Sequence, residues 1–141
     1  MTAHKIFVDT NVLVYAHDAT AGRKRDLARE AILELWNSET GVLSTQVLQE
    51  LFVSLTQKIP IPIDGRKVRT ILEDLCAWGV VVNDEQSMLG AIDLKAKYQL
   101  SFWDSLILDA ARRSGATSLL SEDLSNGQQV GEISIFNPFD A

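Results

Sequence analysis

The stretch Lys5-Ile6-Phe7-Val8-Asp9-Thr10-Asn11 decides the fold of this chain. Its first four residues form a short apolar run, which predicts a buried strand. The run ends abruptly at the polar triplet 9–11, whose side chains can cap a helix that we expect over residues 12–17. The chain therefore opens with a strand and a helix that are joined by an acid.

The rest of the sequence repeats this alternation of short apolar runs and helical patterns. We expect helices at about 22–37, 45–58, 65–77, 85–98 and 102–114, and strands at 42–44, 80–82, 117–120 and 132–136. Gly41 is expected to break the helix before it, residues 80–82 to form a buried strand, 124–131 a loop, and 132–136 an edge strand. Alternating strands and helices predict a three-layer α/β/α fold, in which helices flank a short, central, parallel sheet. We expect one domain over residues 1–141.

Composition fits a globular protein, with 141 residues of which 46% are hydrophobic and 23% charged. No apolar run approaches the ~20 residues of a membrane-spanning helix, and the first residues lack the pattern of a secretory signal. The single cysteine, Cys76, excludes an internal disulfide and a cysteine-rich zinc site. We therefore expect a cytoplasmic protein without a membrane segment.

The formal net charge of −6 counts against tight, non-specific binding to nucleic acid, which usually requires a basic surface. Basic residues do cluster in two places, namely Arg23, Lys24, Arg25 and Arg29, and then Arg66, Lys67 and Arg69. These clusters are either solvated helix faces or contacts for RNA phosphates or for an acidic partner.

Two of the expected strands end in acids. Asp9 follows the first strand, and Glu122 and Asp123 follow the strand at 117–120. Parallel α/β sheets place their active sites at the carboxyl ends of the strands, so these acids are candidates for a site. Asp9 could instead serve only as a helix cap.

Two further acids lie on helices. Asp104 precedes Ile107, Leu108 and Ala111 by three, four and seven residues, which places it on the core-facing stripe, whereas Asp109 is expected in solvent. Glu50 lies at the margin of an apolar stripe, where a solvated acid and a ligand are equally consistent with the pattern. Carboxylates from separate segments suit Mg²⁺ or Mn²⁺, which prefer oxygen ligands.

Four motifs, in order, resemble those of the PIN-domain family, and together they cover almost the whole chain. They are Phe7-Val8-Asp9-Thr10-Asn11-Val12-Leu13, then Gln49-Glu50-Leu51, then Leu100-Ser101-Phe102-Trp103-Asp104-Ser105-Leu106-Ile107, and finally Leu119-Leu120-Ser121-Glu122-Asp123-Leu124. The tail, residues 133–139, is also similar to bacterial members, and the small format resembles VapC-like toxins of toxin–antitoxin pairs.

The resemblance implies a metal-dependent endoribonuclease that uses Mg²⁺ or Mn²⁺, leaves 5′-phosphate and 3′-hydroxyl ends, forms a homodimer and is inhibited by a small cognate antitoxin. It assigns the acid roles to Asp9, Glu50, Asp104 and Asp123, of which Asp9, Asp104 and Asp123 would bind metal. Asn11 and Ser121 would orient these acids through hydrogen bonds, with Thr10 as a further candidate. Whether Glu122 shares the role of Asp123, and whether one or two ions bind, stays open.

Other interpretations fit the sequence less well. An aspartyl phosphohydrolase usually has Asp-x-Asp where this chain has Asp9-Thr10-Asn11, and a phospho-receiver domain needs adjacent acids and a late lysine that are missing. A PIN-like binding module and a nuclease for DNA or RNA processing remain alternatives. His4 and His17 are expected on the surface. Trp103 is expected to pack in the core or to stack on a base of single-stranded RNA.

Overall fold

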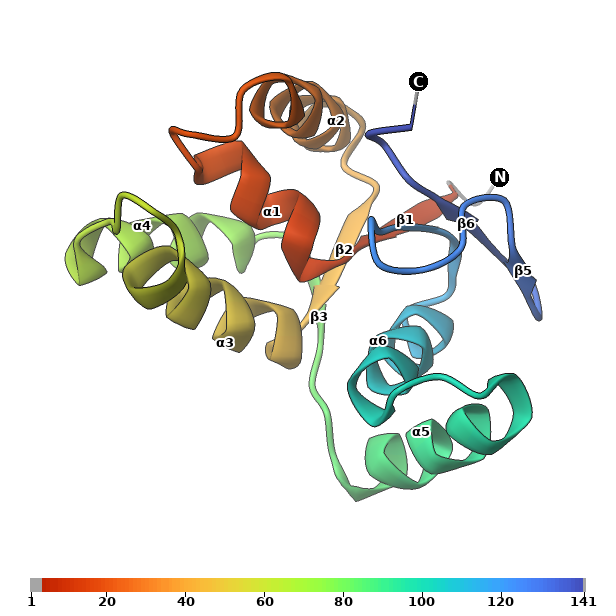
Figure 1. Ribbon diagram of the computed structural model, residues 1–141. Helices are drawn as coiled ribbons and strands as arrows, with labels where there is room; N and C mark the ends of the chain where they lie inside the picture. Colours follow the sequence, from red (N-terminus) through yellow and green to blue (C-terminus); the bar gives the residue numbers. More distant parts are fainter. Residues whose placement is uncertain (1–3, 141) are drawn as a thin grey trace.

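The structure is a computed structural model that describes residues 4–140, and its centre is a six-stranded sheet (Figure 1). The strand order is β3-β2-β1-β4-β6-β5, and every pair is parallel except β5 with β6. The strands are β1 (Lys5–Val8), β2 (Gly41–Ser44), β3 (Gly79–Val81), β4 (Ala116–Leu120), β5 (Gln129–Val130) and β6 (Ile133–Phe136).

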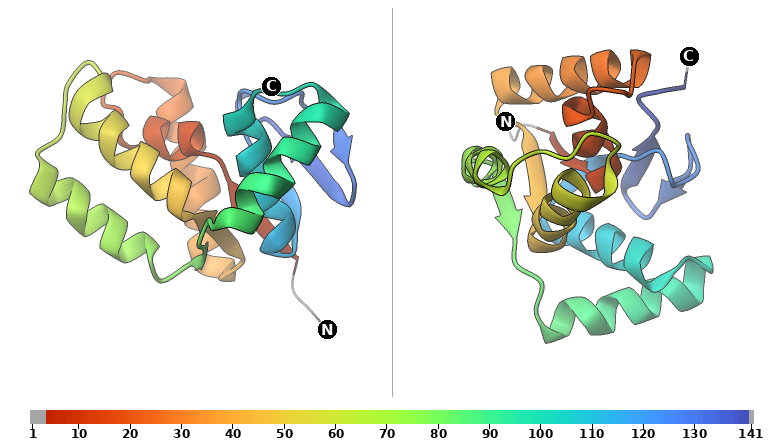
Figure 2. Two further views of the ribbon diagram at one scale, coloured as in Figure 1. Left: turned by 90° about the horizontal axis from the view of Figure 1, so that it is seen from below. Right: turned by 60° about the vertical axis from the view of Figure 1, so that its left-hand side comes forward.

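Helices cover both faces of the sheet, which confirms the predicted three-layer α/β/α fold. They are α1 (Thr10–His17), α2 (Arg23–Ser38), α3 (Thr45–Val53), the π-helical turn η1 (Ser54–Lys58), α4 (Gly65–Leu75), α5 (Glu85–Tyr98) and α6 (Phe102–Arg113). Helices α1 to α4 gather on one side of the molecule, whereas α5 and α6 lie on the other (Figures 1 and 2). Within residues 4–140, no helix combines the length and the apolar character that crossing a membrane requires.

The first strand lies in the middle of the sheet, with β2 on one side and β4 on the other. Phe7 and Val8 are fully buried, and Phe7 is aligned with Leu119 of β4 while Val8 is aligned with Leu120. Because the two strands are parallel and in this register, they end side by side. The residues that follow them, Asp9 and Ser121, therefore come out at the same edge of the sheet.

The carboxyl-terminal strands differ from the prediction. The strand predicted at the edge over 132–136 is β6, which lies between β4 and β5, and part of the predicted loop 124–131 forms β5. Gly131, at a φ of 58°, turns the chain so that β5 runs back antiparallel to β6. Two residues of strand are too short to produce a period-2 pattern, so the sequence could not show β5.

Gly41 and Gly79 begin the neighbouring strands β2 and β3, and they have roles that the sequence pattern did not show. Helix α2 ends at Ser38, so Gly41 does not break it but begins β2. A Cβ atom on Gly41 would lie 2.5 Å from the ring of Trp78, so the glycine makes room for this ring. Gly79 begins β3, which is an edge strand and only partly buried, so the prediction of a buried strand at 80–82 was wrong; Val82 is 70% exposed.

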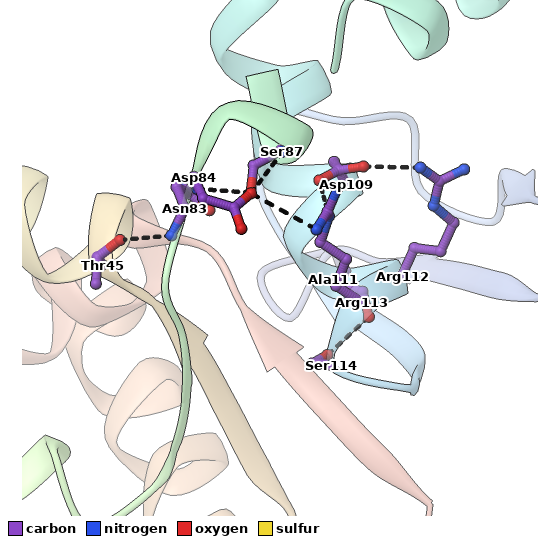
Figure 3. Close-up of polar contacts among 9 residues, drawn as sticks. All are labelled: Thr45, Asn83, Asp84, Ser87, Asp109, Ala111, Arg112, Arg113 and Ser114. Carbon is purple, nitrogen blue, oxygen red and sulfur yellow. Dashed lines mark hydrogen bonds and ion pairs between the residues drawn. The ribbon is translucent and has the colours of Figure 1, made fainter. Parts of the chain in front are cut away.

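Asp109 was expected in solvent, but its side chain is fully buried in α6. It accepts hydrogen bonds from Arg112 (2.7 Å) and from Arg113 Nε (2.6 Å), as Figure 3 shows. Arg113 also reaches Asp84, the residue that caps α5, at 3.8 Å. The buried carboxylate is therefore neutralised by two cations, and this network joins α6 to the start of α5.

Candidate active site

Asp9 is the buried carboxylate of the candidate site. It follows β1 directly and is the N-cap of α1, where its Oδ1 accepts a 2.7 Å hydrogen bond from the Thr10 backbone N–H. Its Oδ2 accepts a second hydrogen bond, of 2.8 Å, from the Ser121 hydroxyl at the end of β4. Asp9 therefore caps the helix and also presents its carboxylate to the edge of the sheet, so the two roles considered for it are compatible.

Asn11 and Ser121 connect Asp9 to Asp123. The Asn11 amide group donates to Asp123 Oδ2 at 3.0 Å and to Asp9 Oδ2 at 3.4 Å. The Ser121 hydroxyl, which donates to Asp9, accepts from the Asp123 backbone N–H at 3.1 Å. Two polar side chains thus bridge acids that lie 114 positions apart in the chain (123 − 9), and this is the geometry that an orienting role requires.

Glu50 and Asp104 bring acids from α3 and α6 to the same region. Partial burial raises the pKa of Glu50, and the charges of Asp104 and Asp123 raise it further, against the lowering effect of a hydrogen bond from Gln46 and of Lys58. Burial likewise raises the pKa of Asp104, with a further contribution from the charge of Asp123. The charge of a neighbouring acid thus raises the pKa of both Glu50 and Asp104, so the two carboxylates lie close to other negative charges.

The expected burial of Asp104 was only partly right. Asp104 lies in the first turn of α6 and is partly exposed, whereas the side chains from Ser105 to Ala111 behind it are buried. Glu50 and Asp123 are exposed. The site therefore combines one buried acid, Asp9, with three more accessible acids.

The pKa of Asp9 is raised to about 6, chiefly because the carboxylate is buried. The hydrogen bonds from Ser121 and Thr10 lower the pKa, while the charges of Asp123 and Glu50 raise it. Loss of hydration and negative neighbours both disfavour the ionised form, and the two hydrogen bonds offset only part of this cost. A carboxylate in such surroundings is stabilised by any cation that reaches it.

The residues fit a divalent cation by their chemistry. Among residues 4–140, none of the four acids forms an ion pair with lysine or arginine within 4 Å, so their charge has no direct partner. In the same part of the chain, no three metal-binding side chains already converge as a coordination group. Carboxylates without a cation repel one another, and Mg²⁺ usually keeps several water ligands and needs only one or two carboxylates directly.

Glu122 is turned away from these acids. Its carboxylate accepts hydrogen bonds from the Tyr15 hydroxyl (2.8 Å) and from Lys24 (2.5 Å), while its backbone N–H donates to Asn11 Oδ1 (3.2 Å). The neighbouring Asp123 is the residue whose side chain reaches Asn11. The Thr10 hydroxyl is buried, with no hydrogen-bond partner among the residues that the structure describes.

Gln46 is a residue that sequence reasoning missed. It is buried in the first turn of α3, lowers the pKa of Glu50 and donates to the Trp103 backbone carbonyl at 3.4 Å. Gln46 thus connects the helix of Glu50 to the start of the helix of Asp104. Its spacing of four residues from Glu50 places both on one helix face, which was the signal available in the sequence.

The predictions for Trp103, for the two histidines and for the first basic cluster have different outcomes. Trp103 is 63% exposed, so the core-packing interpretation was wrong. His4 is exposed as expected, whereas His17 is partly buried, and burial together with Arg29 and Arg25 lowers its pKa. In the first basic cluster, Lys24 binds Glu122 and Arg29 donates to the Ala16 carbonyl, so both have partners within the protein.

Fold and site together define an α/β protein with an acidic site at the carboxyl ends of its central strands. The sequence model of the PIN domain matches residues 6–125, and the chain belongs to this family. No curated protein sequence matches the chain.

Solved structures of toxin–antitoxin proteins are similar in fold. A toxin–antitoxin complex from Klebsiella pneumoniae aligns with a TM-score of 0.71 at 18% identity, over 97% of this chain and 100% of the other. The VapC20 toxin of Mycobacterium tuberculosis, described as cleaving the sarcin–ricin loop, aligns with a TM-score of 0.61 at 20% identity, over 82% and 87%. DNA-bound VapBC from Salmonella typhimurium gives 0.65 at 16% identity, over 94% and 97%.

Proposed function

We propose that this chain, as one PIN domain, is a divalent-metal-dependent endoribonuclease and the toxin of a toxin–antitoxin pair. The observation that carries the nuclease proposal is the group of four acids from separate segments, Asp9, Glu50, Asp104 and Asp123, none of which has an ion-pair partner within 4 Å among residues 4–140. A group of acids attracts cations and repels an anion such as a phosphodiester, yet this group lies at the edge of the sheet where α/β enzymes bind substrates. A bound Mg²⁺ or Mn²⁺ would offset the repulsion and allow a phosphodiester substrate to bind there.

Asp9, Asp104 and Asp123 would bind the ion, and Glu50 would bind it or orient a water molecule. When bound, the ion supplies an activated water near neutral pH and offsets charge on the phosphate. Asn11 and Ser121 hold Asp9 and Asp123 in their positions, so these carboxylates need little reorganisation when a cation enters. No histidine, cysteine or serine is assigned as a nucleophile.

Single-stranded RNA is the substrate that the site surroundings favour. Trp103, the neighbour of Asp104, exposes 63% of its surface, and its ring meets Phe102 edge-on with centroids 5.1 Å apart. Unstacked bases bind to exposed aromatic side chains, whereas bases inside a duplex are not accessible to them. We assign Trp103 the role of stacking on a base near the cleaved phosphate.

The toxin role is supported by the fold similarity to toxin–antitoxin proteins, including complexes from Klebsiella pneumoniae and Salmonella typhimurium. It implies a small antitoxin partner, a homodimer and a cytoplasmic location where RNA is accessible. Growth arrest on expression, abolished by Asp9→Ala, is the expected result in cells. Continued arrest with the Asp9→Ala protein would reject a toxin activity that uses this site.

Cleavage of a fluorogenic single-stranded RNA tests the nuclease proposal. We expect activity with Mn²⁺ or Mg²⁺, none in EDTA, and loss in Asp9→Asn and Asp104→Asn, while Asp93→Asn, which removes an exposed acid of α5, stays active. Circular dichroism checks that each variant is folded. Full activity in EDTA contradicts the proposal, and faster cleavage of single-stranded DNA would reassign the substrate.

A further inference from the structure

The side chain of Glu122 joins three segments of the chain. It belongs to the turn after β4 that carries Asp123, and its two carboxylate oxygens contact Tyr15 on α1 and Lys24 at the start of α2. The Glu122 side chain is 24% exposed and that of Lys24 is 44% exposed, so the ion pair is partly shielded from solvent. We call Tyr15, Lys24, Glu122 and Phe139 the Glu122 clamp.

Two aromatic rings also contact the ammonium group of the clamp lysine. The Lys24 ammonium group lies 4.9 Å from the centroid of the Tyr15 ring and 5.7 Å from that of Phe139. The two rings meet edge-on, 5.1 Å apart and at 79°. Cation–π contacts at these distances are favourable, so Lys24 is fixed by a carboxylate and two rings rather than by one surface ion pair.

The backbone beside the clamp is fixed by the residues of the candidate site. The N–H of Glu122 donates to Asn11, and the N–H of Asp123 donates to Ser121. The Asp123 carboxylate then reaches the Asn11 amide group at 3.0 Å. The backbone of the turn is therefore held by Asn11 and Ser121, and the Glu122 side chain is held by Lys24 and Tyr15.

We infer that Glu122 is a positioning residue rather than a metal ligand, and that the Glu122 clamp sets the place of Asp123. Adjacent carboxylates in a flexible turn could exchange places at a cation. The clamp prevents this exchange, because it occupies both oxygens of Glu122 and leaves Asp123 to face Asn11. The consequence for metal affinity rests on the proposed function, whereas the consequence for the order of the turn does not.

Hydrogen exchange of the metal-free protein tests the clamp itself. In Lys24→Met and in Glu122→Gln, the backbone amides of residues 121–123 should exchange at least several-fold faster, while those of β1 and α6 stay unchanged. Arg69→Met is the matched control, because it removes another surface ion pair, with Glu73 on α4. Unchanged exchange at 121–123 in both clamp variants would overturn the inference.

Calorimetric titration with Mn²⁺ then separates a positioning residue from a ligand. If Glu122 positions Asp123, Lys24→Met and Glu122→Gln should each weaken Mn²⁺ binding by about 10-fold, and the double variant should be no weaker than either single one. If Glu122 is instead a ligand, Glu122→Gln weakens binding as much as Asp123→Asn, whereas Lys24→Met frees the carboxylate and leaves binding unchanged or tighter. That second pattern contradicts the inference.

Absence of Mn²⁺ binding by the unmodified protein would reject the proposed function. Hydrogen exchange would still decide whether the Glu122 clamp orders the turn.

Discussion

A Cβ atom on Gly90 would lie 2.3 Å from Oδ1 of Asp109, so the two helices α5 and α6 meet where a glycine faces a buried carboxylate. The same Cβ would lie 3.2 Å from the Arg112 side-chain nitrogen that binds this oxygen. Asp109 is fully buried and bound to two arginines, so it has no free space into which it can move.

Gly90→Ala should therefore destabilise the protein, although alanine is the better helix former by ~1 kcal/mol. Overpacking a filled site costs roughly 1–3 kcal/mol, which exceeds the gain. Urea unfolding followed by circular dichroism measures the difference. Gly65→Ala is the control, because its Cβ would meet only Phe52, at 4.0 Å, and it should be neutral or slightly stabilising. A Gly90→Ala protein as stable as the original would show that α5 and α6 can separate without cost.

Asp109→Asn should lower the free energy of unfolding by about 2 kcal/mol, the order expected for losing hydrogen bonds to a charged group. The amide nitrogen would face an arginine donor, and both Arg112 and Arg113 would lose their buried anion. Asp93→Asn, at an exposed position on α5, should leave the unfolding midpoint unchanged. Equal midpoints for the two variants would show that the buried ion pairs contribute no net stability.

Asp109 also shows where prediction from sequence stopped. Helical periodicity placed Asp109 on the face opposite Asp104 and assigned that face to solvent, which is wrong because the Asp109 side chain is fully buried. Helix α5 packs against Asp109 through Gly90, and every side chain from Ser105 to Ala111 is buried. A periodic pattern reports which residues share a face, but it does not report whether a second helix packs over that face.

The strand ends were predictable for a different reason. The positions of Asp9 and Ser121 follow from the order and length of β1 and β4, because parallel strands that pair in register end at one edge. The partners of side chains from distant segments could not be predicted in this way. Lys24 and Tyr15 show no local pattern that points to Glu122, since their contact depends on how α1 and α2 pack beside the turn after β4.

The raised pKa of Asp9 predicts that the metal-free protein loses stability as the pH rises. A carboxyl group with a pKa of about 6 when folded, against 3.8 ordinarily, binds more protons in the folded state between these values. Its contribution to stability is therefore fully present below about pH 4 and lost as the pH rises through 6, by roughly 3 kcal/mol at most.

Asp9→Asn should remove this pH dependence, since asparagine also caps helices well and stays neutral. In EDTA at pH 7 its melting temperature should exceed that of the original protein by a few degrees, while RNA cleavage is lost. Added Mn²⁺ should raise the melting temperature of the original protein and leave that of Asp9→Asn nearly unchanged. An Asp9→Asn protein that melts lower at pH 7 in EDTA would mean that the ionised carboxylate stabilises the fold.

Trp103→Ala should weaken RNA binding without weakening the chemical step. Stacking of one base on an aromatic ring contributes ~1–3 kcal/mol, so KM should rise by roughly 5- to 150-fold while kcat changes little. Trp103→Phe should retain most of the affinity, because a smaller ring still stacks. Leu33→Ala, which truncates a side chain on α2 that is 60% exposed, is the control for losing exposed apolar surface and should not change KM.

If Trp103→Ala instead lowers kcat at unchanged KM, Trp103 acts through the start of α6 and the placement of Asp104. If RNA kinetics are unchanged but a dimer dissociates or an antitoxin no longer binds, the exposed indole belongs to a protein interface. Fluorescence quenching by uncleaved RNA in EDTA provides a second measure, since Trp103 is far more exposed than Trp36 (38%) and Trp78 (8%), and the quenching should disappear in Trp103→Phe.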